Sequence, residues 1–184
     1  TGASPKVLDL QKVLIVSLWQ VTVVVYDGTP IKGGWPGQKE TIFGLAADAG
    51  STTLSAQLCN LKSGEVVATA GTMNPQIRFG EDLMSRVSYL MMNPDDMTDM
   101  TREVRTAINY LAAQTTNDVG SDPRHIVDVS FVGHPIMHPI LLGIAPTEFG
   151  VAPFALANAL AVHITAADLA LYFHTSAQAS IITC

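Results

Sequence analysis

The chain has 184 residues, of which 48% are hydrophobic and 14% charged, with 16 acidic side chains against 10 basic ones and a net charge of −6. This length suffices for one domain of ordinary size, and the low charge content with a mean hydropathy of +0.29 excludes an intrinsically disordered chain. The acidic balance argues against a nucleic-acid-binding surface, so we expect no nucleic-acid partner.

Residues 1–40 are interpreted as a small strand-bearing unit. The β-branched run at residues 21–25 predicts a strand, and the Asp27-Gly28 pair after it favours a tight hairpin. Glycine and proline at residues 33–37 are expected to interrupt any regular element. We therefore predict a boundary near residue 40 and a second unit over residues 41–184.

Three apolar runs separated by turns follow at residues 42–50, 53–61 and 65–73. In the second run Leu54, Ala56 and Leu58 alternate with polar side chains, as expected for a strand with one buried face. Three consecutive strands with short turns predict a meander.

The apolar spacing becomes helical after Pro75. Leu83, Val87 and Leu90 predict an amphipathic helix, on which Arg86 is interpreted as an exposed or ion-paired residue rather than a phosphate ligand. A second helical stripe follows the Asn-Pro-Asp-Asp sequence at 93–96, and it consists of Met97, Met100, Val104, Ile108 and Leu111. We therefore expect two successive helices.

Beyond the second helix, residues 125–132 return to alternation and predict another strand, which ends at Gly133. Helical spacing resumes over residues 136–141, and Gly143, Pro146 and Pro153 are then expected to fragment the chain into loop.

The cysteines and the apolar runs bear on location. Cys59 and Cys184 are too few for a disulfide framework, a zinc site or an iron–sulfur cluster held by this chain alone. The longest apolar stretch, residues 13–25, is shorter than the roughly 18 residues that cross a bilayer. We predict a cytoplasmic chain with no membrane contact.

The segment with the strongest chemical character is Ala-Asp-Ala-Gly-Ser-Thr-Thr at residues 47–53, between two predicted strands. Such a turn presents backbone N–H groups and three hydroxyls to one point, and Gly50 allows a phosphate to approach the backbone closely. Asp48 would then face a Mg²⁺ ion through water, because Mg²⁺ keeps much of its hydration shell. The alternative is a polar hairpin turn capped by Asp48.

The order of these elements resembles the start of each ribonuclease-H-like half in the actin, sugar-kinase and heat-shock ATPase superfamily. The sequences GLAADAGSTT (44–53), LKSGEVVATAG (61–71), MNPQIRFGEDLMSRVSY (73–89) and VGHPIMHPILLGIAPTEFGVAPF (132–154) more closely resemble the reductive activators of corrinoid proteins. The resemblance implies an α/β fold: the first, incomplete lobe of an actin-like ATPase domain at 41–184, after the end of a small middle domain at 1–40.

The family's function is an expectation that follows from this resemblance. Its members use ATP to drive an electron from a [2Fe-2S] cluster in an upstream domain to Co(II) of a corrinoid methyltransferase protein, which restores Co(I). The expected partner is thus a corrinoid protein, and the expected cofactors are ATP and Mg²⁺. The second phosphate loop and the adenosine site would lie beyond Cys184, so we expect this chain alone to be inactive and to bind Mg-ATP no tighter than about millimolar.

The resemblance also assigns roles to residues. Asp48 would be the carboxylate for the metal-bound water and phosphate, with Gly50 and the hydroxyl residues Ser51, Thr52 and Thr53 as the phosphate turn. The segment after the third strand would lie near the γ-phosphate and position an attacking water, through Asn74, Gln76, Gly80 and Asp82. For Asn74 and Gln76 the alternative is a capped turn before a helix.

The third block contains Gly133 and a histidine pair. Gly133 is counted with the cofactor-binding residues, whereas His134 stands where the family pattern has asparagine. His134 and His138 have the i, i+4 spacing of metal ligands on one helical face, but no third ligand has a matching spacing. Metal binding by this pair stays open.

Two other functions stay open at this point. The chain could be a non-enzymatic docking module that associates with a partner or with itself through the open face of the lobe, because a lobe without its mate exposes surface. It could instead be a fragment of a sugar- or acetate-kinase-like phosphotransferase.

Overall fold

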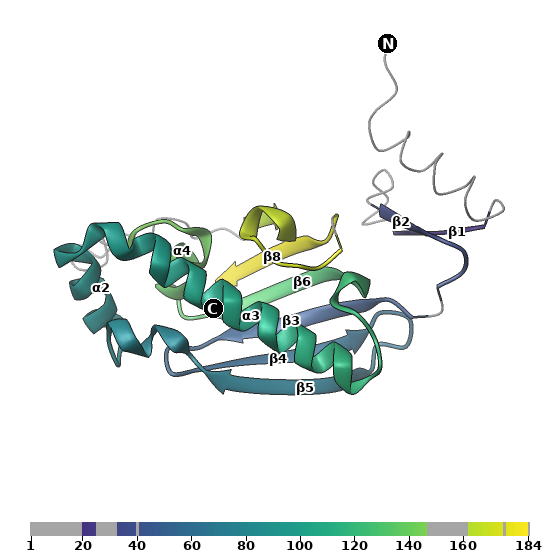
Figure 1. Ribbon diagram of the computed structural model, residues 1–184, viewed down its shortest axis with the longest axis horizontal. Helices are drawn as coiled ribbons and strands as arrows, with labels where there is room; N and C mark the ends of the chain where they lie inside the picture. Colours follow the sequence, from purple (N-terminus) through teal and green to yellow (C-terminus); the bar gives the residue numbers. More distant parts are fainter. Residues whose placement is uncertain (1–19, 25–32, 40, 147–161, 175, 184) are drawn as a thin grey trace, which may run out of the picture.

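A computed structural model describes residues 20–24, 33–39, 41–146, 162–174 and 176–183. It contains a two-stranded sheet and a six-stranded sheet (Figure 1). The small sheet pairs β1 (Val21–Val24) with β2 (Gly33–Pro36) in antiparallel fashion. The large sheet has the order β5-β4-β3-β6-β8-β7. Its strands are β3 (Phe43–Ala49), β4 (Thr53–Asn60), β5 (Val66–Met73), β6 (Ile126–Gly133), β7 (Val162–Thr165) and β8 (Gln178–Thr183).

The large sheet begins with the predicted meander. Strands β3, β4 and β5 pair in antiparallel fashion, whereas β6 joins β3 in parallel and β8 joins β6 in parallel. The parallel pairing requires a crossover, which the helices between β5 and β6 provide. This arrangement confirms the α/β, ribonuclease-H-like fold class.

The helices follow the predicted order. The α-helices are α2 (Leu83–Met92), α3 (Met97–Asp118) and α4 (Met137–Leu142), and the 3-10 turns are η1 (Pro75–Phe79), η2 (Pro94–Asp96), η3 (Pro123–His125) and η5 (Ala166–Leu169). Helix α2 starts where Asp82 accepts a hydrogen bond from the Ser85 amide at 2.7 Å. None of the described helices is long and apolar enough to cross a membrane.

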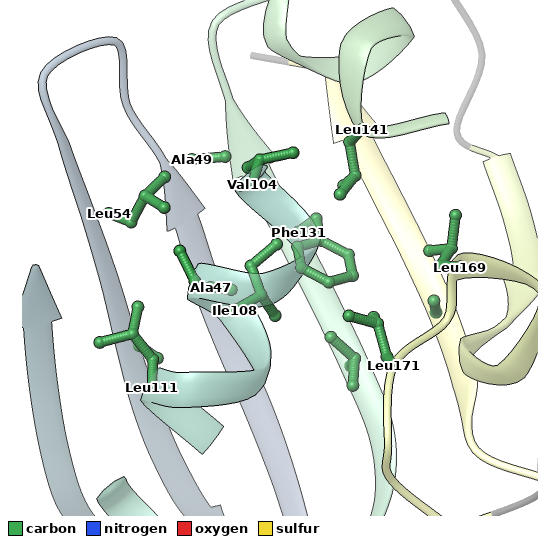
Figure 2. Close-up of a cluster of buried hydrophobic side chains, with 14 of the residues drawn as sticks. Ala47, Ala49, Leu54, Val104, Ile108, Leu111, Phe131, Leu141, Leu169 and Leu171 are labelled. Carbon is green, nitrogen blue, oxygen red and sulfur yellow. The ribbon is translucent and has the colours of Figure 1, made fainter. Parts of the chain in front are cut away.

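The core lies between α3 and one face of the large sheet. Helix α3 runs obliquely across that face (Figure 1) and buries the side chains spaced three and four residues apart. In Figure 2, Val104, Ile108 and Leu111 of α3 lie over Ala47, Leu54 and Phe131 of the sheet. Every second residue of β3 therefore points into this core.

The centre of the other face of the sheet carries small and polar side chains. On β3 and β4, the residues that alternate with the core positions are exposed: Ala46, Asp48, Ser55 and Gln57. The neighbouring rows continue with Thr69 and Gly71 on β5 and with Ser130 on β6. Asp48 thus stands on the face of the sheet that α3 leaves uncovered.

Two expectations from the sequence are wrong. Residues 33–36 are strand β2 rather than a break, because β1 supplies a pairing edge and Thr22 fixes the end of β2 by donating to the Gly37 carbonyl at 2.9 Å. Residues after 162 are not only loop, since β8 pairs with both β6 and β7. Asp27, Gly28, Pro153 and Cys184 lie outside the described residues.

Candidate functional site

Asp48 and the turn that follows it lie where strand β3 ends and strand β4 begins. Asp48 is exposed on β3, level with Ser55 of β4 and Val132 of β6. Residues 50–52 then connect β3 to β4, with Thr52 and Thr53 exposed and Ser51 partly buried. The structure therefore brings the predicted carboxylate and the predicted phosphate turn together, at the surface.

The carbonyl groups of this turn all accept hydrogen bonds from the segment after β5. The Asn74 side-chain amide donates to the Gly50 carbonyl at 2.8 Å, and the Asn74 backbone amide donates to the Thr52 carbonyl at 2.8 Å. Between them, Nη2 of Arg86 donates to the Ser51 carbonyl at 2.5 Å. The three successive carbonyls of residues 50–52 thus all point toward Asn74 and Arg86.

The orientation of the carbonyls fixes the orientation of the amides. Because a trans peptide is planar, each N–H points opposite to the carbonyl of the preceding residue, so the amides of Ser51, Thr52 and Thr53 point away from Asn74 and Arg86. Within the described residues, the amides of Ser51 and Thr52 donate no hydrogen bond. Successive unpaired N–H groups of this kind form an anion-binding concavity.

Two glycines allow the chain to pack closely around the turn. A Cβ atom on Gly50 would lie 2.6 Å from the Thr53 carbonyl oxygen, and one on Gly133 would lie 2.6 Å from the Ala49 carbonyl oxygen. A side chain at either position would push the backbone apart. A Cβ on Gly80 would lie 2.8 Å from the backbone nitrogen of Arg86, so Gly80 allows the close approach of α2, and its contact with a ligand stays a prediction.

Asn74 and Gln76 are completely buried. Asn74 caps η1 by accepting from the Gln76 amide at 3.0 Å, and the Gln76 side chain donates to the Met100 carbonyl at 2.8 Å. These contacts favour the alternative of a capped turn that positions the phosphate loop. Direct contact of either residue with an attacking water stays a prediction.

Asp82 caps α2 and does not share the environment of Asp48. Its side chain is exposed, and the hydrogen bond from the Ser85 amide lowers the pKa of the carboxyl group. The carboxylate is therefore committed to the start of the helix, and its predicted role at the γ-phosphate stays a prediction.

Arg86 differs from its sequence interpretation, because its side chain is completely buried. Besides the Ser51 carbonyl, its guanidinium donates to the Gly80 carbonyl at 2.9 Å and approaches Oε1 of Gln76 at 3.4 Å. Burial lowers the pKa of the guanidinium, an effect that the charge of Asp82 partly opposes. The helical period did contain this information, since Arg86 lies three residues after Leu83 and four before Leu90, on the buried face of α2.

The histidine pair lies at the start of α4. His138 is buried with neither ring nitrogen hydrogen-bonded, and burial lowers its pKa. Nδ1 of His134 accepts from the Ile136 amide at 3.3 Å. Among the residues that the structure describes, no group of three or more His, Cys, Asp or Glu side chains could hold a metal ion.

A cavity of about 720 Å³ lies away from the turn. It is bounded by α3, by residues 142–143 and by residues 168–172, and it includes Arg102 and Arg105. Arg105 donates to the Leu141 carbonyl at 2.9 Å and Asn109 to the Ala170 carbonyl at 3.0 Å. These side chains therefore join α3 to the neighbouring loops.

A model of the family described as the RACo middle region matches residues 43–184. This chain belongs to that family. A curated relative of this RACo-family chain, the corrinoid activation enzyme RamQ of Eubacterium limosum, is 26% identical over 117 residues, which are 64% of this chain and 20% of RamQ. A solved structure titled reductive activator for corrinoid, iron-sulfur protein matches with a TM-score of 0.85 and 28% identity, over 97% of this chain and 29% of that one.

These comparisons confirm the resemblance to the corrinoid reductive activators. The RACo-family chain spans about a fifth of RamQ and less than a third of the solved activator. What the larger proteins do as a whole is therefore a proposal for this chain.

Proposed function

We propose that this chain supplies the first phosphate-binding turn of an ATP-driven reductive activator of corrinoid proteins. The observation that carries the proposal is the turn after β3, where three carbonyls are held inward and the amides of Ser51 and Thr52 are left unpaired. Membership of the RACo middle-region family supports the activator assignment.

The residues at the turn fit a magnesium-bound phosphate. Backbone amides and the hydroxyls of Ser51, Thr52 and Thr53 would receive phosphate oxygens, and Asp48 would hold a water of the Mg²⁺ ion. Such amides are oriented before the ligand arrives, so they stabilise negative charge on the phosphate without reorganisation. Asn74 holds the turn in place by donating hydrogen bonds to the carbonyls of Gly50 and Thr52.

In this proposal, ATP supplies the energy that moves an electron from a [2Fe-2S] cluster to Co(II) in a corrinoid protein, giving Co(I). With two cysteines among its 184 residues, the chain cannot provide the four cysteine ligands of such a cluster, so in this proposal the cluster belongs outside these residues. The corrinoid partner follows from the names of the relatives, which describe activation of corrinoid proteins.

Titration of the ¹⁵N-labelled chain with pyrophosphate, followed by NMR, tests the site. With Mg²⁺ present we expect the amide shifts to be confined to residues 50–53, with a dissociation constant of about millimolar. In Asp48→Asn the response with Mg²⁺ should weaken, because the carboxylate that holds the metal-bound water is gone. Without Mg²⁺ the same variant should respond more strongly than the wild type, since a carboxylate repels the anion.

Asp95→Asn is the matched control, because Asp95 is an exposed carboxylate on the 3-10 turn before α3. It should respond as the wild type does under both conditions. Shifts that are absent from residues 50–53 at about 20 mM pyrophosphate, where a millimolar site would be largely filled, would contradict the proposed site. A micromolar dissociation constant for Mg-ATP would contradict the expectation that one lobe binds weakly.

The docking-module alternative fits the structure less well. A docking face is expected to carry a contiguous apolar patch. The centre of the uncovered face instead presents Ala46, Ser55, Gln57 and Thr69, which are small or polar. Its exposed apolar side chains do not form one patch, because Val66 and Met73 stand at opposite ends of β5 and Ile182 stands on β8. Light scattering that showed concentration-dependent association would revive this alternative.

A further inference from the structure

Arg86 is a completely buried cation beside the proposed phosphate turn. The ion pairs among the described residues involve Arg78, Arg102 and Arg124, and none of them joins Arg86 to a carboxylate. Its partners are the carbonyls of Ser51 and Gly80, with Oε1 of Gln76 and the sulfur of Met137 farther away, and the charge of Asp82 compensates it only in part. Taking a charge out of water is costly unless hydrogen bonds and an opposite charge compensate it. The position of this charge therefore needs an explanation.

The guanidinium connects the turn to the start of α2. Its Nη2 atom holds the Ser51 carbonyl at 2.5 Å, and its Nε atom holds the Gly80 carbonyl at 2.9 Å. A planar guanidinium makes such contacts in fixed directions, which a lysine ammonium cannot reproduce. Without the contact to Ser51, the peptide between residues 51 and 52 could rotate and the Thr52 amide would lose its outward direction.

The positive charge acts on the same turn. A phosphate bound to the Ser51 and Thr52 amides would lie on one side of the backbone of the turn, with the guanidinium on the other side. Charges interact more strongly across protein than across water, because the effective dielectric constant is lower. An anion on the turn would therefore also compensate the buried cation.

We propose that Arg86 is the positioning residue of the phosphate turn: it holds the Ser51 carbonyl inward, turns the Thr52 amide toward the ligand, and provides a buried positive charge that a bound phosphate compensates. This inference rests on the proposed function, whose site it deepens. Arg86 acts through Ser51 and does not itself touch the ligand.

Two substitutions separate the effect of the hydrogen-bond geometry of Arg86 from the effect of its positive charge. Arg86→Lys keeps the charge and loses the planar geometry, whereas Arg86→Met loses both. In ligand-free ¹⁵N spectra, both variants should shift the Ser51 and Thr52 amides. In the Mg-pyrophosphate titration, the initial slope of the turn shifts should fall about tenfold in Arg86→Lys, as expected for one lost charge-assisted hydrogen bond, and further in Arg86→Met.

Arg102→Lys and Arg102→Met are the matched controls. The Arg102 side chain is 60% exposed on α3 and pairs with Asp99 at the surface. Both control variants should retain the wild-type turn shifts and titration slope. If Arg86→Met does not fold, Arg86→Lys decides the question, and its thermal midpoint and its amide shifts outside the turn report whether the fold is kept.

The inference and the proposed function can fail separately. A wild-type chain with no response to Mg-pyrophosphate at residues 50–53 would overturn the proposed site. A folded Arg86→Lys with wild-type Thr52 shifts and slope would overturn the role of Arg86, even if the wild type binds. A folded Arg86→Lys that loses slope while its other amides are unchanged supports the positioning role, since a merely structural residue would not give that pattern.

Discussion

At the scale of single residues, buried side chains fix the backbone of the proposed site through hydrogen bonds on the side away from solvent. Asn74, Gln76 and Arg86 have no exposed surface, and their polar atoms bind backbone carbonyls. Buried polar groups that are fully paired fix one conformation, because any other conformation leaves them unpaired. The exposed residues of the turn can therefore be kept in place without help from a ligand.

Gly133 gives a residue-scale prediction. In Gly133→Ala the new Cβ would lie 2.6 Å from the Ala49 carbonyl oxygen and 3.3 Å from the Ala49 side chain, so β3 and β6 would have to separate just before the turn. We expect the free energy of unfolding to fall by about 1–3 kcal/mol, measured by urea denaturation. Gly71→Ala is the control, because its Cβ would meet the Leu54 carbonyl at an ordinary 3.6 Å. Equal stability of the two variants would contradict the prediction.

At the scale of elements, α3 is the helix that makes the large sheet stable. Its buried stripe consists of Met100, Val104, Ile108 and Leu111, and the helix backbone lies closest to β4 and β5. In Figure 2, Val104, Ile108 and Leu111 also lie over Ala47 of β3 and Phe131 of β6. Because β3 carries Asp48 and ends at the turn, the packing of α3 also determines where the site lies. The helix period predicted this stripe correctly, since all of its apolar residues serve packing.

Ile108 gives the element-scale prediction. Ile108→Ala should lower the free energy of unfolding by about 2–5 kcal/mol, because it removes buried methyl groups and leaves a cavity between α3 and the sheet. Tyr110→Ala is the control on the same helix, since Tyr110 is 58% exposed, and it should change stability by less than about 0.5 kcal/mol. Thermal or urea unfolding compares the two, and similar losses would contradict the assigned packing of α3.

At the scale of the whole molecule, an aromatic contact joins the two sheets. The ring of Trp35 on β2 lies 4.4 Å from the ring of His174 and 6.3 Å from that of His125, measured between centroids. Burial lowers the pKa of both imidazoles, with smaller effects from charges on Lys39, Asp122 and Arg124 at His125 and from His125 at His174. The small sheet thus contributes to the environment of the two histidines.

Trp35→Ala should raise the pKa of His174 toward its ordinary value, because the ring would regain water. A buried histidine with a lowered pKa binds its proton more weakly in the folded state, so stability is lost as the pH falls through about 6.5. The loss between pH 7 and pH 5 should therefore be smaller in Trp35→Ala than in the wild type. NMR titration of the histidines and unfolding at both pH values measure this, with Tyr110→Ala as the control. An unchanged His174 titration would show that Trp35 does not shield the ring.

The sequence by itself determined the meander and the two helices after it, because alternation, helical period and turn residues are local patterns that need no knowledge of neighbouring elements. The family followed from the resemblance of four sequence blocks between residues 44 and 154. The sequence also placed Asp48 near the end of a strand, directly before the turn at residues 50–53. Only the tertiary structure decided that residues 33–36 and 178–183 are strands, since their pairing partners are distant in the chain. For Arg86 the helical period indicates a position on the buried face of α2, but only the fold brings the Ser51 and Gly80 carbonyls to it and so makes the burial of its charge possible.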